Sequence, residues 1–361
     1  MSNFARWPRW AARLLLATLA VLVVVAMVPG SVSPQPARAA AEHRSDVGLY
    51  RAIVNRVAQG EDYYAAAAAE QRANGYPTAP AVAFREPAET LLLVALQTDL
   101  ARHAALLGVA IAATAALWFA LGRMDLTPAT RRWALLLTLT GMAVCLAQNA
   151  PYMHETWGGL LITLSLALRR PERWALSVCV ALAACLVREL ALPFLFVMLA
   201  FAAHERRWRE SLAWLGAIAV FGGVFAIHCG LAGAQHRVGD LSSGGWLKFN
   251  GLSFVVATLR WNAVLALAPG WMLIAVASVS AVGLAGCRSG LASRGALTLI
   301  GYIIAFAVVG RPDNQYWGIL YAPLVPLGLA LAPPALKELA VRALTKAPLP
   351  DRSAVSQPST A

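Results

Sequence analysis

The chain has 361 residues, of which 59% are hydrophobic and only 13% charged, and its net charge is +12. An ordinary globular domain is about 25% charged and about 45–50% apolar, so the composition argues against soluble domains and predicts an all-α, polytopic membrane protein. The positive charge is typical of the basic residues on the cytoplasmic side of membrane helices. No basic stripe with interleaved aromatic residues points to a nucleic-acid partner.

The apolar runs predict about ten transmembrane helices. A hydrocarbon core of about 30 Å requires about 20 apolar residues in a helix. Runs that approach this length occur at residues 11–30, 104–122, 133–149, 152–168, 174–187, 190–204, 211–232, 262–286, 295–310 and 317–335.

Charge predicts how these helices are oriented. The segments that ten crossings place on the side of the N-terminus are all basic, whereas the outer loop 150–157 has no lysine or arginine. We therefore expect a multi-pass protein of the cell (inner or plasma) membrane with both termini in the cytoplasm. Residues 1–336 form the predicted transmembrane domain, with its first outer loop at 31–103. Residues 337–361 form a cytoplasmic tail, rich in Pro and Ser, that we expect to be disordered.

The start of the chain has a second interpretation. Residues 1–40 combine a basic start, an apolar stretch and the small-residue sequence "ARAAA", as a cleaved secretory signal does. Under either interpretation the segment that follows lies outside the cytoplasm.

The sequence of the first outer loop predicts two interfacial helices. In "GLYRAIVNRVAQG" the apolar residues Leu49, Ile53 and Val57 recur every fourth position, and Gly60 ends the pattern. "DYYAAAAAEQRANG" predicts a second helix ended by Gly75. A proline-rich, extended stretch then leads into an apolar helix.

Asp46 lies just before the first of these helices. Its simplest role is a solvated acid or an N-cap. A carboxylate held at the membrane surface beside an apolar cavity can also act as a general base. Glu61 and Asp62 are the competing candidates for that role.

Two pairs of charged residues stand at the outer ends of predicted helices. His154 and Glu155 begin one span, where they are either part of an interfacial belt or part of a site. Arg188 and Glu189 interrupt an apolar run at the tip of a helical hairpin, and charges at such a depth are costly and usually functional. One interpretation is that the two residues pair with each other or with neighbouring residues. The other is that Arg188 binds a phosphate through two nitrogens.

The last outer loop is rich in groups that suit a sugar. Amides and charged groups hydrogen-bond hydroxyls, and the apolar face of a sugar stacks on aromatic rings. The alternative is an aromatic belt beside a turn. The residues concerned are Arg311, Asp313, Asn314, Tyr316 and Trp317.

The sequence predicts no metal site. The histidines are scattered, and the spacing of the cysteines is not that of metal ligands. A requirement for a divalent metal is left open, and no other cofactor is predicted.

With these residues in place, the chain resembles the GT-C superfamily of integral-membrane glycosyltransferases. It is most similar to bacterial enzymes, including mannosyltransferases, that use polyprenyl-phosphate sugars. The resemblance lies in a first helix that leads into a long outer loop, and in the segments "DVGLY", "GEDYY", "YPTAPAVAFREP", "HETWGGLLITLSLAL" and "DNQYWGILYAPLVPLGLAL".

The resemblance implies that Asp46 is the catalytic base. It further implies that the loop residues Tyr50, Asp62, Tyr63 and Arg85 join the charged and aromatic residues above in binding substrate. The chain departs from many relatives in two ways. Asp46 is flanked by Ser45 and Val47 rather than by a second acid, and the chain ends without a soluble outer domain.

On this basis we expect an inverting hexosyl- or mannosyltransferase that acts on the outer face of the membrane. The acceptor is left open between a glycan, a lipid and a protein. The alternative is a transporter or flippase of a lipid-linked sugar, which requires polar residues at mid-membrane depth. A third hypothesis is a degenerate family member with a structural role.

Overall fold

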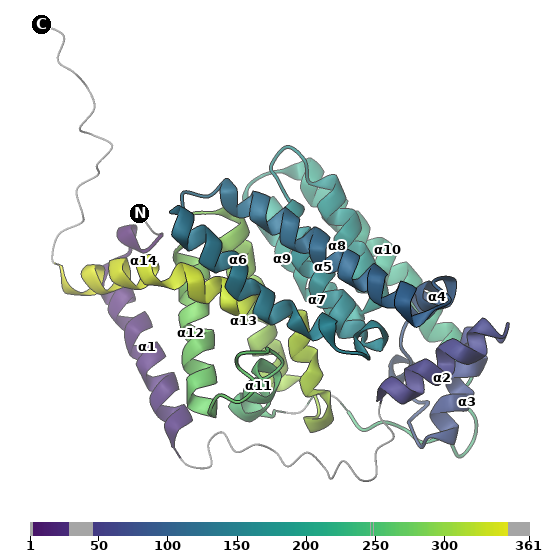
Figure 1. The fold of residues 1–361 in the computed structure, drawn as a ribbon. Coiled ribbons are helices and arrows are strands. Elements are labelled where there is room, and N and C mark those ends of the chain that lie inside the picture. The colour runs from purple at the N-terminus through teal and green to yellow at the C-terminus, as the bar shows by residue number, and fades with distance from the viewer. Residues whose placement is uncertain (1–2, 29–45, 246, 248, 346–361) are drawn as a thin grey trace, which may run out of the picture.

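A computed structural model gives the fold of this chain and describes residues 3–28, 46–245, 247 and 249–345. These residues are almost entirely helical (Figure 1). Within them only two isolated β-bridges occur, Ala79 with Ser242 and Leu247 with Val309. The prediction of an all-α protein is therefore confirmed.

Except for the helix at Gly251–Leu259, which lies outside every predicted run, the α-helices follow the predicted apolar runs and interfacial segments. They are α1 Arg9–Met27, α2 Asp46–Ala58, α3 Tyr63–Ala73, α4 Pro87–Ala95, α5 Asp99–Gly122, α6 Pro128–Met142, α7 His154–Leu168, α8 Ala175–Val187, α9 Leu192–His204, α10 Trp208–Gly233, α11 Gly251–Leu259, α12 Gly270–Gly286, α13 Gly290–Val308 and α14 Leu324–Leu344. Short 3₁₀ helices join them: η1 Asn3–Arg6, η2 Ala81–Ala83, η3 Ala143–Leu146, η4 Ala150–Tyr152, η5 Glu189–Ala191 and η6 Pro312–Leu320.

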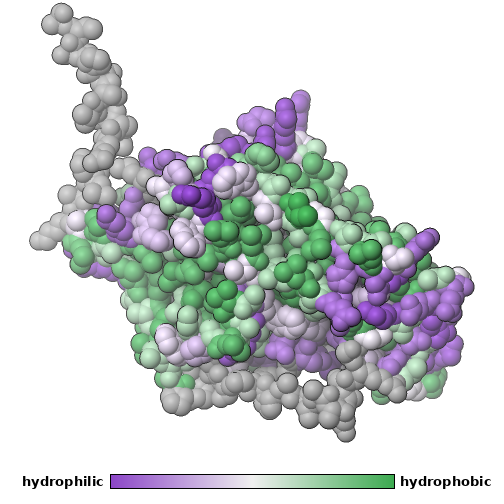
Figure 2. Space-filling model, in the orientation of Figure 1, coloured by the Kyte–Doolittle hydropathy of each residue, from purple (hydrophilic) through white to green (hydrophobic). Residues whose placement is uncertain are grey.

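Five of these helices, α1, α5, α10, α13 and α14, are long and apolar enough to cross a membrane. Three shorter apolar stretches coincide with α8, with η5 and α9 together, and with α12. Figure 2 shows a broad hydrophobic band across one face, with hydrophilic residues along its upper edge and around α2 and α3 at the lower right. These features are compatible with a multi-pass membrane protein. The count of ten spans and the orientation of the termini stay predictions.

The two interfacial helices form where the sequence predicts them. Leu49 and Ile53 of α2 are buried against α3, and the chain turns at Gly60 and Gly75 with φ of +92° and +69°. Asp62 caps α3 by accepting a hydrogen bond from the backbone N–H of Ala65. Local sequence therefore determines both ends of α3.

Two predicted spans are shorter in the structure. The run 133–149 stops being α-helical at Met142 and continues as η3. The run 262–286 becomes α-helical only after Pro269. At its start, the side-chain Oδ1 of Asn262 accepts a hydrogen bond from the backbone N–H of Val264, which favours a local turn there over a helix.

The last helix extends beyond the boundary that we predicted at residue 336. α14 continues through Pro333 and Pro334 to Leu344, so residues 337–344 are helical. Leu339 and Ala343 pack against Ala12 of α1, which gives this end of α14 a partner. Residues 346–361, the rest of the predicted tail, lie outside the described residues.

Close backbone contact holds η6 against α7. A Cβ atom added to Gly159 would lie 2.4 Å from the backbone oxygen of Ile319. Only glycine allows this approach, and it brings the aromatic residues of η6 to the N-terminal end of α7.

Candidate functional site

Polar side chains gather at the N-terminal end of α7, where α4, α8 and η6 meet. We call this group the loop-side cluster. It is built from residues that are far apart in the sequence, and most of their side chains are buried. Its members are Asp46, Tyr50, Tyr76, Arg85, Glu86, Glu89, His154, Glu155, Arg188, Glu189, Asn314, Tyr316 and Trp317.

Arg188 is at the centre of the cluster and is fully buried. Its Nε lies 2.5 Å from Oε1 of Glu155, and its Nη1 pairs with Glu189. The guanidinium carbon lies 5.6 Å from the ring centre of Trp317. Arg188 therefore pairs with its neighbours, as one of the two sequence interpretations proposed. Its Nη2 is buried without a hydrogen-bond partner, so part of its donor capacity is free.

Arg85 joins separate elements of the cluster. Its Nε donates to the hydroxyl of Tyr50 on α2 at 3.1 Å, and its Nη2 donates to the hydroxyl of Tyr316 on η6 at 3.3 Å. Its Nη1 lies 3.7 Å from Glu189. The hydroxyl of Tyr63 donates to the backbone oxygen of Arg85 at 2.6 Å. Tyr50, Tyr316 and Glu189 therefore meet around the guanidinium of Arg85, and Tyr63 holds its backbone.

Asp46 is the first residue of α2 and is half-buried. The hydroxyl of Tyr76 donates a hydrogen bond of 2.7 Å to its Oδ1. Burial and the charge of Asp46 raise the pKa of Tyr76, and burial raises the pKa of Tyr50 to about 12. Both phenols are therefore protonated near neutral pH and stay available as hydrogen-bond donors.

Two carboxyl groups in the cluster were missed from the sequence. Glu86 and Glu89 are 2% and 1% exposed, and they lie at the start of α4. Burial raises the pKa of Glu86 to about 8, and burial with the charge of Glu155 raises that of Glu89. The sequence "FREPAETLLL" carried a signal for them, since two acids directly before an apolar run are unusual. From the sequence alone, we predict for that segment only an extended, proline-rich stretch that leads into an apolar helix.

His154 lies beside Glu89. Its Nδ1 is 3.0 Å from Oε2 of Glu89, and its ring packs edge-on against Tyr50 with ring centres 4.8 Å apart. The two polar groups do not have the angles of a hydrogen bond, so both remain without a partner in spite of their short separation. A hydrogen bond weakens steeply when it is misaligned, so the short distance does not satisfy either group.

The other predicted site residues lie at or near the surface, with the exception of Asn314. Asp62 is the N-cap of α3. Arg311 and Asp313 are partly exposed and exposed, and Nε of Arg311 lies 3.6 Å from Oδ1 of Asp313. Asn314 is buried, and its Oδ1 has no hydrogen-bond partner. Only Asn314 of these four adds an unpartnered buried polar atom to the cluster.

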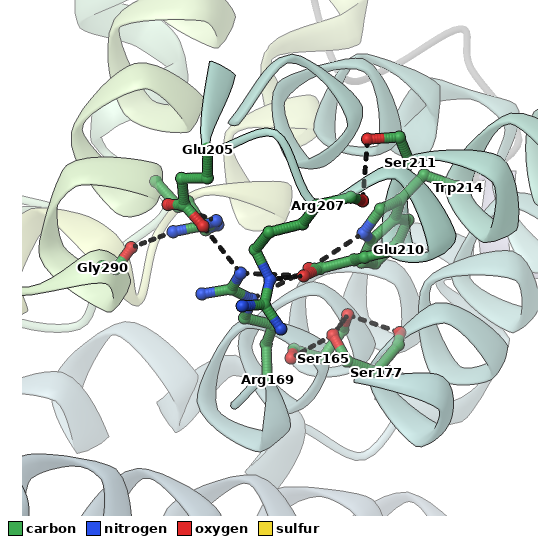
Figure 3. A network of polar contacts seen from close by, with 10 residues as sticks. Ser165, Arg169, Ser177, Glu205, Arg207, Glu210, Ser211, Trp214 and Gly290 are labelled. Atoms are coloured by element: carbon green, nitrogen blue, oxygen red, sulfur yellow. Dashed lines mark hydrogen bonds and ion pairs between the residues drawn. The ribbon is translucent and has the colours of Figure 1, made fainter. Parts of the chain in front are cut away.

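A second polar cluster lies at the opposite end of α7, and we call it the hairpin-side cluster (Figure 3). The carboxylate of Glu210 accepts hydrogen bonds from Nε and Nη2 of Arg169, both at 2.9 Å, and from Nε of Arg207 at 2.6 Å. Glu205 pairs with Arg169 at 2.9 Å and with Arg294 at 2.8 Å. Each of the two carboxylates is therefore neutralised by two arginines.

Across the described ranges, no group of three or more His, Cys, Asp or Glu side chains is arranged to hold a metal ion. No family model, curated protein or solved structure matches this chain. The functional interpretation therefore rests on the geometry of the two clusters and on the sequence motifs.

Proposed function

We propose that this protein is an inverting membrane glycosyltransferase of the GT-C type, which moves a hexosyl or mannosyl group from a polyprenyl-phosphate donor to an acceptor hydroxyl. One observation carries the proposal most directly. A half-buried carboxylate, Asp46, begins an interfacial helix that also carries Tyr50, the phenol bonded to the half-buried Arg85.

The reaction that we propose needs one base. The Asp46 carboxylate takes the proton of the acceptor hydroxyl while the hydroxyl oxygen bonds to the anomeric carbon. The bond between that carbon and the phosphate oxygen breaks on the opposite face, and its electron pair leaves with the polyprenyl phosphate. No acid is required to protonate such a leaving group, so a second catalytic carboxyl is unnecessary.

A cation must stabilise the departing phosphate, and two arginines are candidates. Arg188 keeps an unpartnered Nη2, but its other nitrogens face Glu155 and Glu189. Among the described residues, Arg85 donates side-chain hydrogen bonds to the neutral phenols of Tyr50 and Tyr316, and its ion pair with Glu189 is longer, at 3.7 Å. A phosphate therefore has weaker interactions to displace at Arg85 than at Arg188. We therefore assign Arg85 the larger share of phosphate binding, with Arg188 as the inner partner.

The lengths of the helices support access from the lipid phase. α8 and α9 have 13 residues each, which is about 20 Å, whereas the hydrocarbon core is about 30 Å thick. At least one polar end of this hairpin must therefore lie below the membrane surface. α2 and α4, which pack on each other, cover the loop-side end. A lipid-linked donor can reach such a recessed site laterally.

The transporter alternative finds less support. The core between the two clusters consists mainly of apolar side chains such as Ile162, Ala181 and Met198, which are all buried. A pathway for a sugar through the protein would require polar groups at this depth.

Asp46→Asn provides the test. The amide keeps the size of the side chain and an oxygen for the Tyr76 hydroxyl, but it cannot take up a proton. We expect sugar transfer in reconstituted vesicles, supplied with radiolabelled polyprenyl-phosphate hexoses, to fall by about 10²–10⁴-fold while donor binding persists. Asp62→Asn is the matched control and should retain transfer. Normal transfer by Asp46→Asn would overturn the assignment of the base, and no transfer by the unmodified protein with any such donor would overturn the enzyme proposal.

A further inference from the structure

A groove lies between the N-terminal part of α1 and the C-terminal part of α14, and it shares no residue with the loop-side cluster. Its volume is about 740 Å³, which is large enough for a lipid headgroup. The two helices lie side by side near the N-terminus in Figure 1. The groove is lined by Pro8, Arg9, Trp10, Arg13, Leu14, Ala17 and Arg342.

The arginines of this groove are held in place by the backbone of α14. Arg9 donates to the oxygen of Leu344 at 3.0 Å, and Arg13 donates to the oxygen of Ala343 at 2.9 Å. These bonds satisfy carbonyl groups that the end of a helix leaves free, and they place two guanidinium groups side by side. The positions of both cations are therefore set before any ligand binds.

No carboxylate of the described residues neutralises the positive charge of Arg9 and Arg13. Among the described residues, no carboxylate lies within ion-pair distance of either side chain. Nε of Arg9 is also buried without a hydrogen-bond partner. Glu338 precedes Arg342 by one turn of α14, so the proposed cationic site consists of Arg9 and Arg13 alone.

Apolar residues continue the groove along α1. Trp10 and Leu14 are 69% and 60% exposed, and α1 runs on from them as one of the helices apolar enough to cross a membrane. Tryptophan is enriched at the level of lipid headgroups. Cations at one end and exposed apolar side chains at the other match a molecule with a phosphate and an acyl chain, and not a free phosphate.

We propose that this groove is a binding site for an anionic phospholipid, with the phosphate on Arg9 and Arg13 and an acyl chain along Leu14 and Ala17. Such a lipid links α1 to α14 at the membrane surface. Basic sites at the membrane surface attract anionic lipids by about 1 kcal/mol for each arginine, so two arginines correspond to about a 30-fold preference over a zwitterionic lipid.

Native mass spectrometry of the full chain in detergent tests the proposal. The probes are phosphatidylglycerol and phosphatidylcholine with identical acyl chains, and inorganic phosphate. We expect the unmodified protein to bind phosphatidylglycerol about 30-fold more tightly than phosphatidylcholine, and R9Q/R13Q to lose that preference. The control R170Q/R173Q removes the same charge from exposed positions between α7 and α8 and should bind as the unmodified protein does.

Three results would overturn the proposal. The first is equal binding of both lipids by the unmodified protein, and the second is an unchanged preference in R9Q/R13Q. The third is competition by inorganic phosphate at the same concentration as the lipid, because it would identify a simple anion site. If R9Q/R13Q does not fold, binding of phosphatidylglycerol by A17W provides the test. Ala17 is exposed, so a larger side chain at this position fills the groove and leaves both arginines in place. Unchanged binding of phosphatidylglycerol by A17W would also contradict the proposal.

Discussion

The loop-side and hairpin-side clusters lie at the two ends of α7, which has 15 residues and is therefore about 22 Å long. In the hairpin-side cluster, three arginines surround the two carboxylates Glu205 and Glu210. In the loop-side cluster, Arg85 and Arg188 form ion pairs with only Glu155 and Glu189, although the cluster contains five acids. Those acids are Asp46, Glu86, Glu89, Glu155 and Glu189.

The two clusters also differ in how many buried polar atoms lack a partner. The hairpin-side cluster leaves only Nε of Arg294 without one among the buried side-chain atoms of its five charged residues. The loop-side cluster leaves several, on Glu86, Glu89, His154, Arg188, Asn314 and Trp317.

An unpartnered buried polar group costs about 1–3 kcal/mol. The saturated cluster suits a structural role, whereas the unsaturated one is costly to the fold and suits the binding of a polar ligand. The four predictions below test this distinction.

The largest effect is expected from Glu210→Ala in the hairpin-side cluster. The substitution leaves Arg169 and Arg207 without their shared carboxylate, and breaking a buried pair in this way costs about 3–5 kcal/mol. Unfolding in mixed micelles measures the loss, and transfer per folded molecule should be unchanged. Glu172→Ala, at an exposed position, is the control. A loss below about 1 kcal/mol would mean that this cluster does not stabilise the fold.

Arg188→Lys should separate catalysis from stability. Lysine keeps the charge but cannot reach Glu155 and Glu189 with two fixed nitrogens, so the donor is held less accurately. We expect transfer at limiting donor to fall by about 10²-fold, a loss typical of misplaced binding groups. Arg169→Lys is the counterpart at the other end of α7, and it should lower stability without lowering transfer per folded molecule. Full activity of Arg188→Lys would show that the forked contact of Arg188 with Glu155 and Glu189 is not needed to hold the donor.

Gly159→Ala should displace η6 from α7. The added methyl group would lie 2.4 Å from the oxygen of Ile319, and such overpacking costs about 1–3 kcal/mol. Because η6 carries Tyr316 and Trp317, transfer should fall together with stability. Gly216→Ala on α10, where an added Cβ meets nothing within 4 Å, is the control and should be neutral or slightly stabilising. Normal stability and transfer in Gly159→Ala would show that the position of η6 is not critical.

The smallest effect concerns the pH dependence that Glu86 causes. Its pKa is raised to about 8 in the folded protein, above the ordinary value of 4.5, so between these values the folded state holds the proton and the unfolded state releases it. Stability therefore falls as pH rises from about 5 to about 8. Thermal unfolding of Glu86→Gln should show a flatter dependence in this range. Glu172→Gln should behave as the unmodified protein, and an unchanged slope in Glu86→Gln would assign the titration to another group.

Much of the helical architecture could be read from the sequence because its causes are local. The period of Leu49 and Ile53 defined the buried face of α2, and Gly60 and Gly75 ended the helical patterns of α2 and α3. The apolar runs were also sound guides to the helices. Their ends were less reliable, since the packing of Leu339 and Ala343 on α1 extends α14 beyond the predicted boundary.

The partners of the charged residues were decided by the tertiary structure. Arg188 was recognised as unusual from the sequence, yet its pairing with Glu155, 33 residues away, required α7 and α8 to pack together. The sequence places Glu86 and Glu89 in a connecting segment, and only the tertiary structure shows that both side chains are buried. Helical periodicity specifies which side chains share one face of a helix, but it does not specify which other helix packs against that face. Burial and pairing, which decide the chemistry of a charged group, depend on contacts between distant parts of the chain.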